Sequence, residues 1–223
     1  MSKLYLVATP IGNLGDITLR AIEILKSVDL IACEDTRHSK ILLDHYGIKK
    51  PLISCFDHSE KKRAPELIAK IKGGMKVALI SDAGTPGIAD PGYRVVQEAI
   101  RVGIGIETLP GPSAFLAALS LSGLPTDRFI FEGFFPVKEG QKKRKIEALK
   151  NEEGTVIFYE SPHRLLKTLK VMESVLGSLP VVIVREISKK FEEVFRGTSA
   201  EAFAHFSGQR VRGEFVLLFN SKQ

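Results

Sequence analysis

The sequence predicts an α/β protein with two small domains, the first built on a mainly parallel sheet and the second on a mixed sheet. Short apolar runs alternate with amphipathic helical windows through the first half of the chain. This alternation is typical of βαβ crossovers around a buried parallel sheet. A Pro-Gly-Pro break at residues 110–112 follows, and the order of elements then changes. We therefore expect an N-terminal domain over residues 1–111 and a C-terminal domain over residues 112–223.

The elements of the first domain follow from the spacing of apolar residues. Residues 3–8 (KLYLVA) predict a strand, and residues 18–27 predict a helix because Ile22 and Leu25 fall on one helical stripe. Further strands are expected at residues 30–33, 52–54, 77–81 and 104–109. Further helices are expected at residues 40–46, 65–72 and 93–102. Pro65 suits the first turn of its helix, where the missing N–H is not needed.

The second domain lacks the regular alternation of the first. Helices are expected at residues 113–121, 141–150, 162–175 and 200–206, and strands at residues 129–133, 155–159, 180–185, 193–196 and 214–219. Ser161 is a candidate cap for the third of these helices, and Thr198 with Glu201 has the spacing of a capping box before the fourth. The two strands around residues 181–196 are too close for a crossover helix. They predict a hairpin, and so a mixed sheet.

Composition excludes several classes of protein. Hydrophobic residues make up 44% of the 223, which is ordinary for a folded domain. The most apolar window, residues 115–124, is shorter than the roughly 18 residues that a membrane span needs. Cys33 and Cys55 lack metal-ligand spacing, and the first residues lack an export signal, so we expect no metal and a cytoplasmic location. Lys and Arg exceed Asp and Glu by 32 to 26, which permits a polyanionic partner.

Loops rich in Gly, Pro and small polar residues follow four of the predicted strands. In open parallel sheets, ligands bind at these carboxyl ends. Any one such loop could simply reverse the chain, but four together, one of them twelve residues long, predict a binding cleft. The sequence contains neither GxxxxGK[ST] nor GxGxxG, so a P-loop or an ordinary dinucleotide site is unsupported. The loops are residues 9–16 (TPIGNLGD), 81–92 (SDAGTPGIADPG), 109–114 (LPGPSA) and 159–164 (YESPHR).

These four loops, with residues 34–37 (EDTR) in their place along the chain, carry a resemblance that runs nearly end to end. Residues 131–136 (FEGFFP) and 185–193 (REISKKFEE) extend it. The chain resembles the ribosomal RNA small subunit methyltransferase I family, within the tetrapyrrole methylase superfamily. The resemblance implies a tetrapyrrole methylase-like fold with a cofactor cleft between the two domains, S-adenosyl-L-methionine as methyl donor, and a homodimer. It also implies transfer to a cytidine ribose 2′-hydroxyl in the decoding region of 16S ribosomal RNA, free or in the assembled small subunit.

Many members of this family continue past the last strand, whereas this sequence ends at Gln223. We expect any RNA contact made by such a segment in relatives either to be absent here or to come from the main body. By the same resemblance, the cofactor-binding residues are Pro10, Asp82, Ala83, Gly84, Thr85, Ile88, Ser113, Ala114, Tyr159, Glu160, Ile187 and Ser188.

Methyl transfer to a ribose hydroxyl needs alignment and a group that accepts or polarises the proton. Asp82 is one candidate, and the others expected to be catalytic are Asp35, Glu160, Glu186 and Lys189. Asp35 has an alternative interpretation as a helix cap or as an ion-pair partner of Arg37. His38 and His163 follow strand ends and are weaker candidates.

Contacts with RNA phosphates would come from Lys and Arg side chains. The candidates are Arg37, Lys61, Lys62, Arg63, Lys142, Lys143, Arg144, Lys145, Arg164 and Lys190. Each cluster taken alone is more typical of solvated helix ends. The aromatic residues are mostly strand Phe and more typical of a core, although Tyr159 and Phe56 lie at loop edges.

Two other functions stay open on the sequence alone. One is a methyltransferase acting on a small tetrapyrrole. The basic excess and the loop that opens with TPIGN at residues 9–13 count against it, since a porphyrinoid cleft would want larger apolar loops than these. The other is a non-catalytic RNA-binding or assembly module of the same fold. Binding of S-adenosylmethionine would separate the second alternative from both enzymes.

Overall fold

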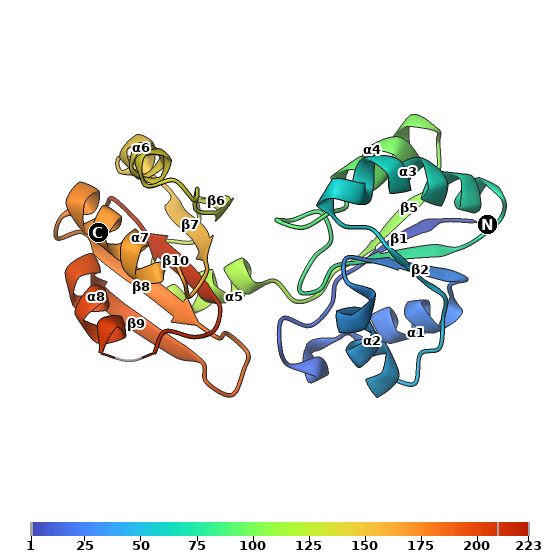
Figure 1. Cartoon of the computed structure of the whole chain (residues 1–223), viewed down its shortest axis with the longest axis horizontal. Helices are drawn as coiled ribbons and strands as arrows, with labels where there is room; N and C mark the ends of the chain where they lie inside the picture. Colours follow the sequence, from blue (N-terminus) through green and yellow to red (C-terminus); the bar gives the residue numbers. More distant parts are fainter. Residues whose placement is uncertain (1, 209, 223) are drawn as a thin grey trace. The chain divides into compact units, whose positions relative to one another are not determined.

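A computed structural model describes residues 2–208 and 210–222 (Figure 1). The chain divides into two compact units, Met1–Ser113 and Ala114–Gln223. Both units combine strands with helices, so the predicted α/β class is confirmed. The units are described in turn.

The sheet of the first unit is parallel throughout, as predicted. Its order is β3-β2-β4-β1-β5, and every neighbouring pair runs in the same direction. The strands β2 and β4 in its middle are buried along their whole length, as expected when helices cover both faces. The strands are β1 (Leu4–Val7), β2 (Leu30–Cys33), β3 (Leu52–Ser54), β4 (Val77–Ile80) and β5 (Ile106–Leu109).

Two helices cover each face of this sheet (Figure 1). On one face lie α1 (Leu19–Ser27) and α2 (Thr36–His45), after the short 3-10 turn η1 (Leu14–Asp16). On the other lie α3 (Asp57–Lys72) and α4 (Tyr93–Arg101). The Thr18 side chain caps α1 by accepting from the Ala21 N–H at 3.1 Å.

The predicted start of α3 is wrong. The helix begins at Asp57 rather than at residue 65, and Pro65 lies in its interior. A proline there removes one helical hydrogen bond and costs about 3 kcal/mol or more. Contacts at the start of the helix offset this cost: the Phe56 N–H donates to Ser59 Oγ at 3.1 Å, and Glu60 bonds to a neighbouring loop. The sequence hides these contacts because residues 57–63 are polar and carry no apolar stripe.

The second unit has a mixed sheet, as predicted. Its order is β6-β7-β10-β8-β9; β6 and β7 are parallel, and the other pairs are antiparallel. The predicted hairpin is confirmed as β8 and β9. The strands are β6 (Phe129–Phe134), β7 (Thr155–Glu160), β8 (Pro180–Arg185), β9 (Glu193–Thr198) and β10 (Phe215–Phe219), and the helices are α5 (Ala114–Ser122), α6 (Glu139–Leu149), α7 (Leu165–Leu176) and α8 (Ser199–Ser207).

One face of this sheet packs against α6, α7 and α8 around Phe158, Met172 and Phe206. The other face meets α5. The predicted start of α7 at residue 162 is wrong, because residues 161–164 form a separate turn before the helix. In that turn, the Arg164 N–H donates to the Ser161 carbonyl at 3.1 Å, and Ser161 Oγ accepts from Arg164 Nε at 3.2 Å.

The capping box of α8 is confirmed. Thr198 Oγ1 accepts from the Glu201 N–H, and Glu201 Oε2 accepts from the Thr198 N–H at 2.8 Å. We expect Thr198→Ala to lower the free energy of unfolding by about 1 kcal/mol, the usual effect of removing a cap. Urea unfolding would measure it, with Ser120→Ala on the exposed side of α5 as control. Equal unfolding midpoints for the two variants would contradict the prediction.

Within residues 2–208 and 210–222, no helix combines the length and apolar character that crossing a membrane requires.

Candidate functional site

Two loops join at the carboxyl ends of the neighbouring strands β1 and β4. The Thr9 N–H donates to the Gly84 carbonyl at 2.9 Å, and the Gly84 N–H donates to the Thr9 carbonyl at 3.0 Å. Thr9 Oγ1 donates to the Ser81 carbonyl at 3.0 Å, and Ser81 Oγ donates to the Gly84 carbonyl at 3.1 Å. Residues 9–16 and 81–92 therefore start from one fixed backbone platform.

A third loop packs closely on this platform. Gly84 has a φ of +82°, and a Cβ on it would lie 3.7 Å from the Pro112 carbonyl oxygen. A Cβ on Gly111 would lie 2.9 Å from the Ala8 Cβ, so only glycine allows the residue 109–113 turn to approach the end of β1. The three loops form a cradle of main-chain groups, which suits a small ligand held by backbone hydrogen bonds.

The far end of the long loop is held by a buried carboxylate that no sequence motif indicated. Glu60 lies on α3, and its Oε1 accepts from the Gly92 N–H at 2.9 Å and from the Arg94 N–H at 2.8 Å. Both N–H groups belong to the start of α4, where a negative charge is favoured. No short-range signal marks Glu60, since its role depends on where α3 meets the loop.

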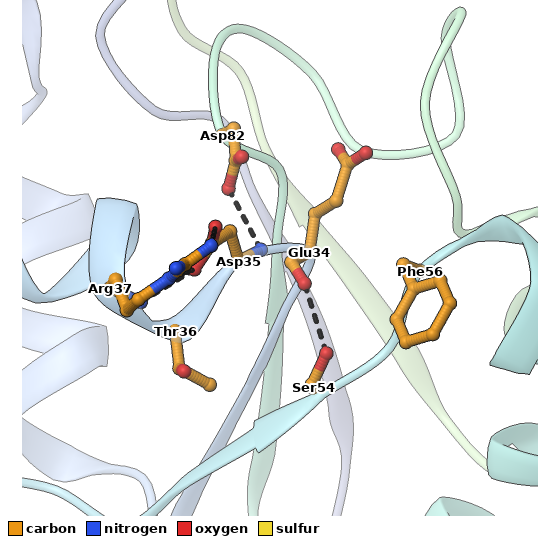
Figure 2. A pocket seen from close by; sticks show the side chains of 7 residues that line it. All are labelled: Glu34, Asp35, Thr36, Arg37, Ser54, Phe56 and Asp82. Carbon is orange, nitrogen blue, oxygen red and sulfur yellow. Dashed lines mark hydrogen bonds and ion pairs between the residues drawn. The ribbon is translucent and has the colours of Figure 1, made fainter.

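A pocket of about 440 Å³ opens at the carboxyl ends of β2, β3 and β4 (Figure 2). Asp82 Oδ1 accepts from the Asp35 N–H at 3.1 Å, and Ser54 Oγ donates to the Glu34 carbonyl at 3.0 Å. Figure 2 shows the pair of Asp35 and Arg37 on one side of the pocket and Phe56 on the other. The pocket is lined by Glu34, Asp35, Thr36, Arg37, Ser54, Phe56 and Asp82.

Asp35 is both a helix cap and an ion-pair partner. Its Oδ1 accepts from the Arg37 N–H at 2.8 Å, and its Oδ2 lies 2.7 Å from Arg37 Nη2. Hydrogen bonds from Arg37 hold the pKa of the Asp35 carboxyl well below its ordinary value of 3.8. A carboxylate this acidic accepts a proton weakly, so the structure favours the cap and ion-pair interpretation of Asp35 over a general base.

This pairing predicts how Asp35 titrates. Because its folded pKa is depressed, Asp35 stabilises the fold above the ordinary carboxyl pKa, and the contribution is lost as pH falls through the folded value. We expect the Asp35 carboxyl group of the wild type to stay ionised at pH 3, as followed by the NMR chemical shift of its carboxyl carbon. Arg37→Ala should return the midpoint towards 3.8. A wild-type midpoint near 3.8 would contradict the ion pair.

Lys142 and Glu160 do not have the roles expected of them. Lys142 is buried, with its Nζ 3.2 Å from Glu160 Oε2 and in contact with the Thr168 hydroxyl. Glu160 Oε1 accepts from Arg164 Nη2 at 2.7 Å and from the Ser161 N–H at 2.8 Å. Lys142 therefore cannot contact RNA, and the Glu160 carboxylate is enclosed by its partners and cannot act as a base. The sequence does indicate this burial, because Lys142 shares a helical face with Ile146 and Leu149.

The remaining basic candidates differ in exposure. Arg63, Lys143 and Lys145 have carboxylate partners, Lys145 lying 2.6 Å from Glu132. Arg164 is half-buried and donates to the Phe135 carbonyl. The exposed cations are Arg37, Lys61, Lys62, Lys143, Arg144 and Lys190.

Glu186 and Lys189 belong to a rigid turn between β8 and β9. Lys189 Nζ lies 2.9 Å from Glu186 Oε1 and 2.7 Å from Glu214 Oε2. Burial disfavours the charged ammonium, but the hydrogen bonds to Glu214 and Glu186 outweigh it and raise the pKa of Lys189. Lys189 is therefore protonated and does not serve as a base. Glu186 and Ser188 have φ values of +51° and +65°, a strained backbone of the kind that accumulates at functional sites.

Tyr159 connects two elements of the second unit. Its hydroxyl accepts from the Phe115 N–H at 3.2 Å, at the start of α5 and next to Ala114. Buried Ile187 and half-buried Ser188 lie on the strained turn. Pro10 is buried in the first unit, where Ala83 and Ile88 are exposed. His38 and His163 are both exposed.

In the part of the chain that the structure describes, no three His, Cys, Asp or Glu side chains gather in a way that could hold a metal ion.

Comparisons with known proteins agree on one family. The sequence model of the family described as tetrapyrrole (corrin/porphyrin) methylases matches residues 3–202. The chain is 52% identical to ribosomal RNA small subunit methyltransferase I of Mesorhizobium japonicum over 96% of this chain and 74% of that protein. It is 46% identical to the protein of that name from Thermotoga maritima over the full length of both. Among solved structures, diphthine synthase superposes with a TM-score of 0.80 at 16% identity, covering 100% of this chain and 91% of the other.

Proposed function

Since the chain belongs to the ribosomal RNA small subunit methyltransferase I family of tetrapyrrole methylases, we propose that it methylates small-subunit ribosomal RNA with S-adenosylmethionine as donor. The observation that carries the proposal is the 46–52% identity to relatives of that name over nearly the whole chain. We place the transfer at the ribose 2′-hydroxyl of a cytidine in the decoding region. This choice rests on the family resemblance that the motifs at residues 9–16, 34–37, 81–92, 109–114 and 159–164 carry.

The cradle at the ends of β4, β1 and β5 fits such a donor. S-adenosylmethionine supplies a methyl group on a positively charged sulfur, and it needs no metal. Gly111 leaves room for main-chain contacts where a Cβ would collide with Ala8, and Gly84 adopts a positive φ of +82° that side chains rarely take. The residues proposed to hold it are Pro10, Asp82, Ala83, Gly84, Thr85, Ile88 and Ser113 of the first unit, and Ala114, Tyr159, the main chain of Glu160, Ile187 and Ser188 of the second.

Alignment is proposed as the main catalytic contribution. Orientation of reacting groups can account for several kcal/mol of a barrier, and the ribose hydroxyl also needs a group that accepts or polarises its proton. Asp35 and Lys189 are poor proton acceptors, and Glu160 is enclosed. Asp82 faces the pocket, is half-buried and accepts from the Asp35 N–H, which makes it the carboxylate best placed to orient the ribose hydroxyl.

The decisive experiment offers methyl-labelled donor to purified small subunits and to free small-subunit ribosomal RNA that lacks the modification. Label in a decoding-region ribose would support the proposal. Label only in a tetrapyrrole mixture would support the other methyltransferase hypothesis instead. Titration calorimetry adds a direct check, since absence of binding at millimolar S-adenosylmethionine would leave only a non-catalytic module. Sedimentation would test the further proposal that the enzyme acts as a homodimer, and cell fractionation its cytoplasmic location.

The exposed cations of α3 and α6 predict a salt-dependent contact with RNA. We expect the triple variant Lys61→Glu, Lys62→Glu and Arg144→Glu to weaken RNA binding. The slope of log K against log salt should become shallower by about 0.7 to 0.9 for each phosphate that the variant no longer neutralises. Lys26→Glu, an exposed charge on α1, is the control. An unchanged slope in the triple variant would remove these residues from the RNA surface, and donor affinity should stay the same throughout.

A further inference from the structure

Strand β6, at one edge of the second unit's sheet, contains a bulge that reorients two phenylalanines. Phe131 of β6 pairs with Ile157 of β7, but the next pair is Phe134 with Tyr159, so β6 has one extra residue there. Gly133 accommodates the extra residue by adopting a φ of +67°, and a Cβ added to it would have no atom within 4 Å. Strand side chains alternate between faces, so the bulge turns Phe134 to the same side as Tyr159.

The same bulge sends the next residue into the core. Phe135 is buried and stacks on Phe158, with ring centroids 3.8 Å apart. Without the extra residue, Gly133 would pair with Tyr159, and Phe134 would take the core position. The bulge therefore allows one phenylalanine to fill the core while its neighbour, Phe134, is left 55% exposed. Bulges at sheet edges commonly re-aim a functional side chain. The exposed phenyl ring of Phe134 is therefore a candidate for such a role.

Phe134 is the exposed end of a row of aromatic rings, which we call the aromatic row: Phe115, Phe131, Tyr159 and Phe134. Phe115 and Phe131 are stacked at 4.4 Å, Phe131 meets Tyr159 at 4.9 Å, and Tyr159 meets Phe134 at 5.4 Å. The hydrogen bond from the Phe115 N–H fixes the Tyr159 hydroxyl. The rings behind Phe134 are thus packed together before any ligand arrives, and a preformed surface lowers the entropy cost of binding.

We propose that the aromatic row is a stacking platform for an unpaired base of the RNA substrate, with Phe134 as the contacting ring. The inference rests on the proposed function. Chemistry on a nucleotide commonly requires it to leave its stack, and an aromatic side chain then takes the place of the neighbouring base. Bases stack on aromatic rings largely irrespective of sequence, which suits a flat exposed ring better than a shaped apolar pocket would.

The charges around the row favour a polyanion over a second copy of the chain or an apolar peptide. The Arg164 guanidinium lies 3.1 Å from the carbonyl of Phe135, directly after Phe134. Lys145 forms an ion pair with Glu132 within the bulge. Exposed Lys138 follows the bulge along the chain. Residues 112–223 carry 17 Lys and Arg against 13 Asp and Glu. Every stacked base brings a phosphate on each side, and the exposed Lys138 can meet it.

The absence of tryptophan from the sequence allows a direct test. Phe134→Trp would give the chain a single tryptophan in the aromatic row, and Ile100→Trp would place one on α4, at a side chain that is 67% exposed and lies outside the proposed RNA surface. The probe is a short single-stranded RNA added to donor-saturated protein. We expect strong quenching of tryptophan fluorescence for Phe134→Trp and little for Ile100→Trp. Equal quenching of both variants would overturn the proposal.

A second variant tests the contribution to affinity. Phe134→Ala should raise the Kd for this RNA about 5-fold to 150-fold, the range for removing one stacked base, while Phe134→Tyr should retain wild-type affinity. An unchanged Kd for Phe134→Ala overturns the platform. If Phe134→Ala instead weakens self-association in sedimentation, and RNA affinity falls only with it, a second copy covers the row and the proposal is wrong. Label transfer by the wild type tests the proposed function separately, because it does not depend on these variants.

Discussion

Replacing Glu160 by alanine is expected to lower the free energy of unfolding by about 3–5 kcal/mol, the usual effect of breaking a buried ion pair. The change leaves the buried Lys142 ammonium without its carboxylate and removes the partner of Arg164 at 2.7 Å. It also removes the acceptor of the Ser161 N–H, at the start of the turn before α7. Guanidinium unfolding followed by circular dichroism would measure the change in stability.

Two further variants separate the buried charge from other effects. Lys142→Met leaves Glu160 paired with Arg164 and fills the space with an apolar chain, so it should cost less than Glu160→Ala. Lys143→Ala, next to Lys142 but on the exposed face of α6, should change stability by less than about 0.5 kcal/mol. If Glu160→Ala and Lys143→Ala unfold at the same denaturant concentration, the pair is not buried as the structure shows it.

Gly92→Ala should strongly weaken binding of S-adenosylmethionine. Gly92 has a φ of +147°, and a Cβ there would lie 2.9 Å from the Gly87 nitrogen and 3.1 Å from its Cα. Both are backbone atoms, so the loop must move, and the Gly92 N–H must shift from Glu60. A displacement of this kind costs on the order of 1–3 kcal/mol. Because the same loop carries residues 82–88 of the proposed donor site, we expect about tenfold weaker binding by calorimetry.

Gly103→Ala is the matched control for this loop. Gly103 also has a positive φ, +73°, but a Cβ added there would have no atom within 4 Å. The variant has the backbone strain of a left-handed alanine, about 1 kcal/mol, without the collision. It should lose some stability and keep wild-type donor affinity. Equal donor affinities for the two variants would show that the end of the residue 81–92 loop does not position the donor.

Local pattern was enough for most of the fold. The strands over residues 30–33, 52–54 and 180–185 agree with the structure residue for residue, since each is a short apolar run between polar breaks. The α8 capping box was equally legible because its hydrogen bonds span three residues. Errors arose at two helix starts: α3 begins at Asp57, where Glu60 contacts a distant loop, and α7 begins at Leu165, after a separate turn at residues 161–164. The domain boundary after Gly111 stays a prediction that limited proteolysis would test.

Much of the candidate site was also predictable. The loops over residues 9–16, 81–92 and 109–114 follow strands whose parallel order brings their carboxyl ends together. The roles of individual charges were less accessible. The run of four basic residues that contains Lys142 predicts an RNA contact, although the helical spacing of Lys142 from Ile146 places it in the core. Glu60 lay in a segment with no apolar pattern, so nothing in the sequence suggested its contact with Gly92.

By itself the sequence determined the order of strands and helices, the parallel and mixed sheets and the loops at their carboxyl ends, because these depend on the local spacing of apolar residues, glycine and proline. Only the tertiary structure decided which charged side chains are buried, that Glu60 binds the start of α4, and that the Gly133 bulge turns Phe134 outward. The physical reason is that the environment of a charge or a ring depends on partners from other elements. Glu160 meets Lys142 from α6 and Thr168 from α7, and that meeting exists only in the folded chain.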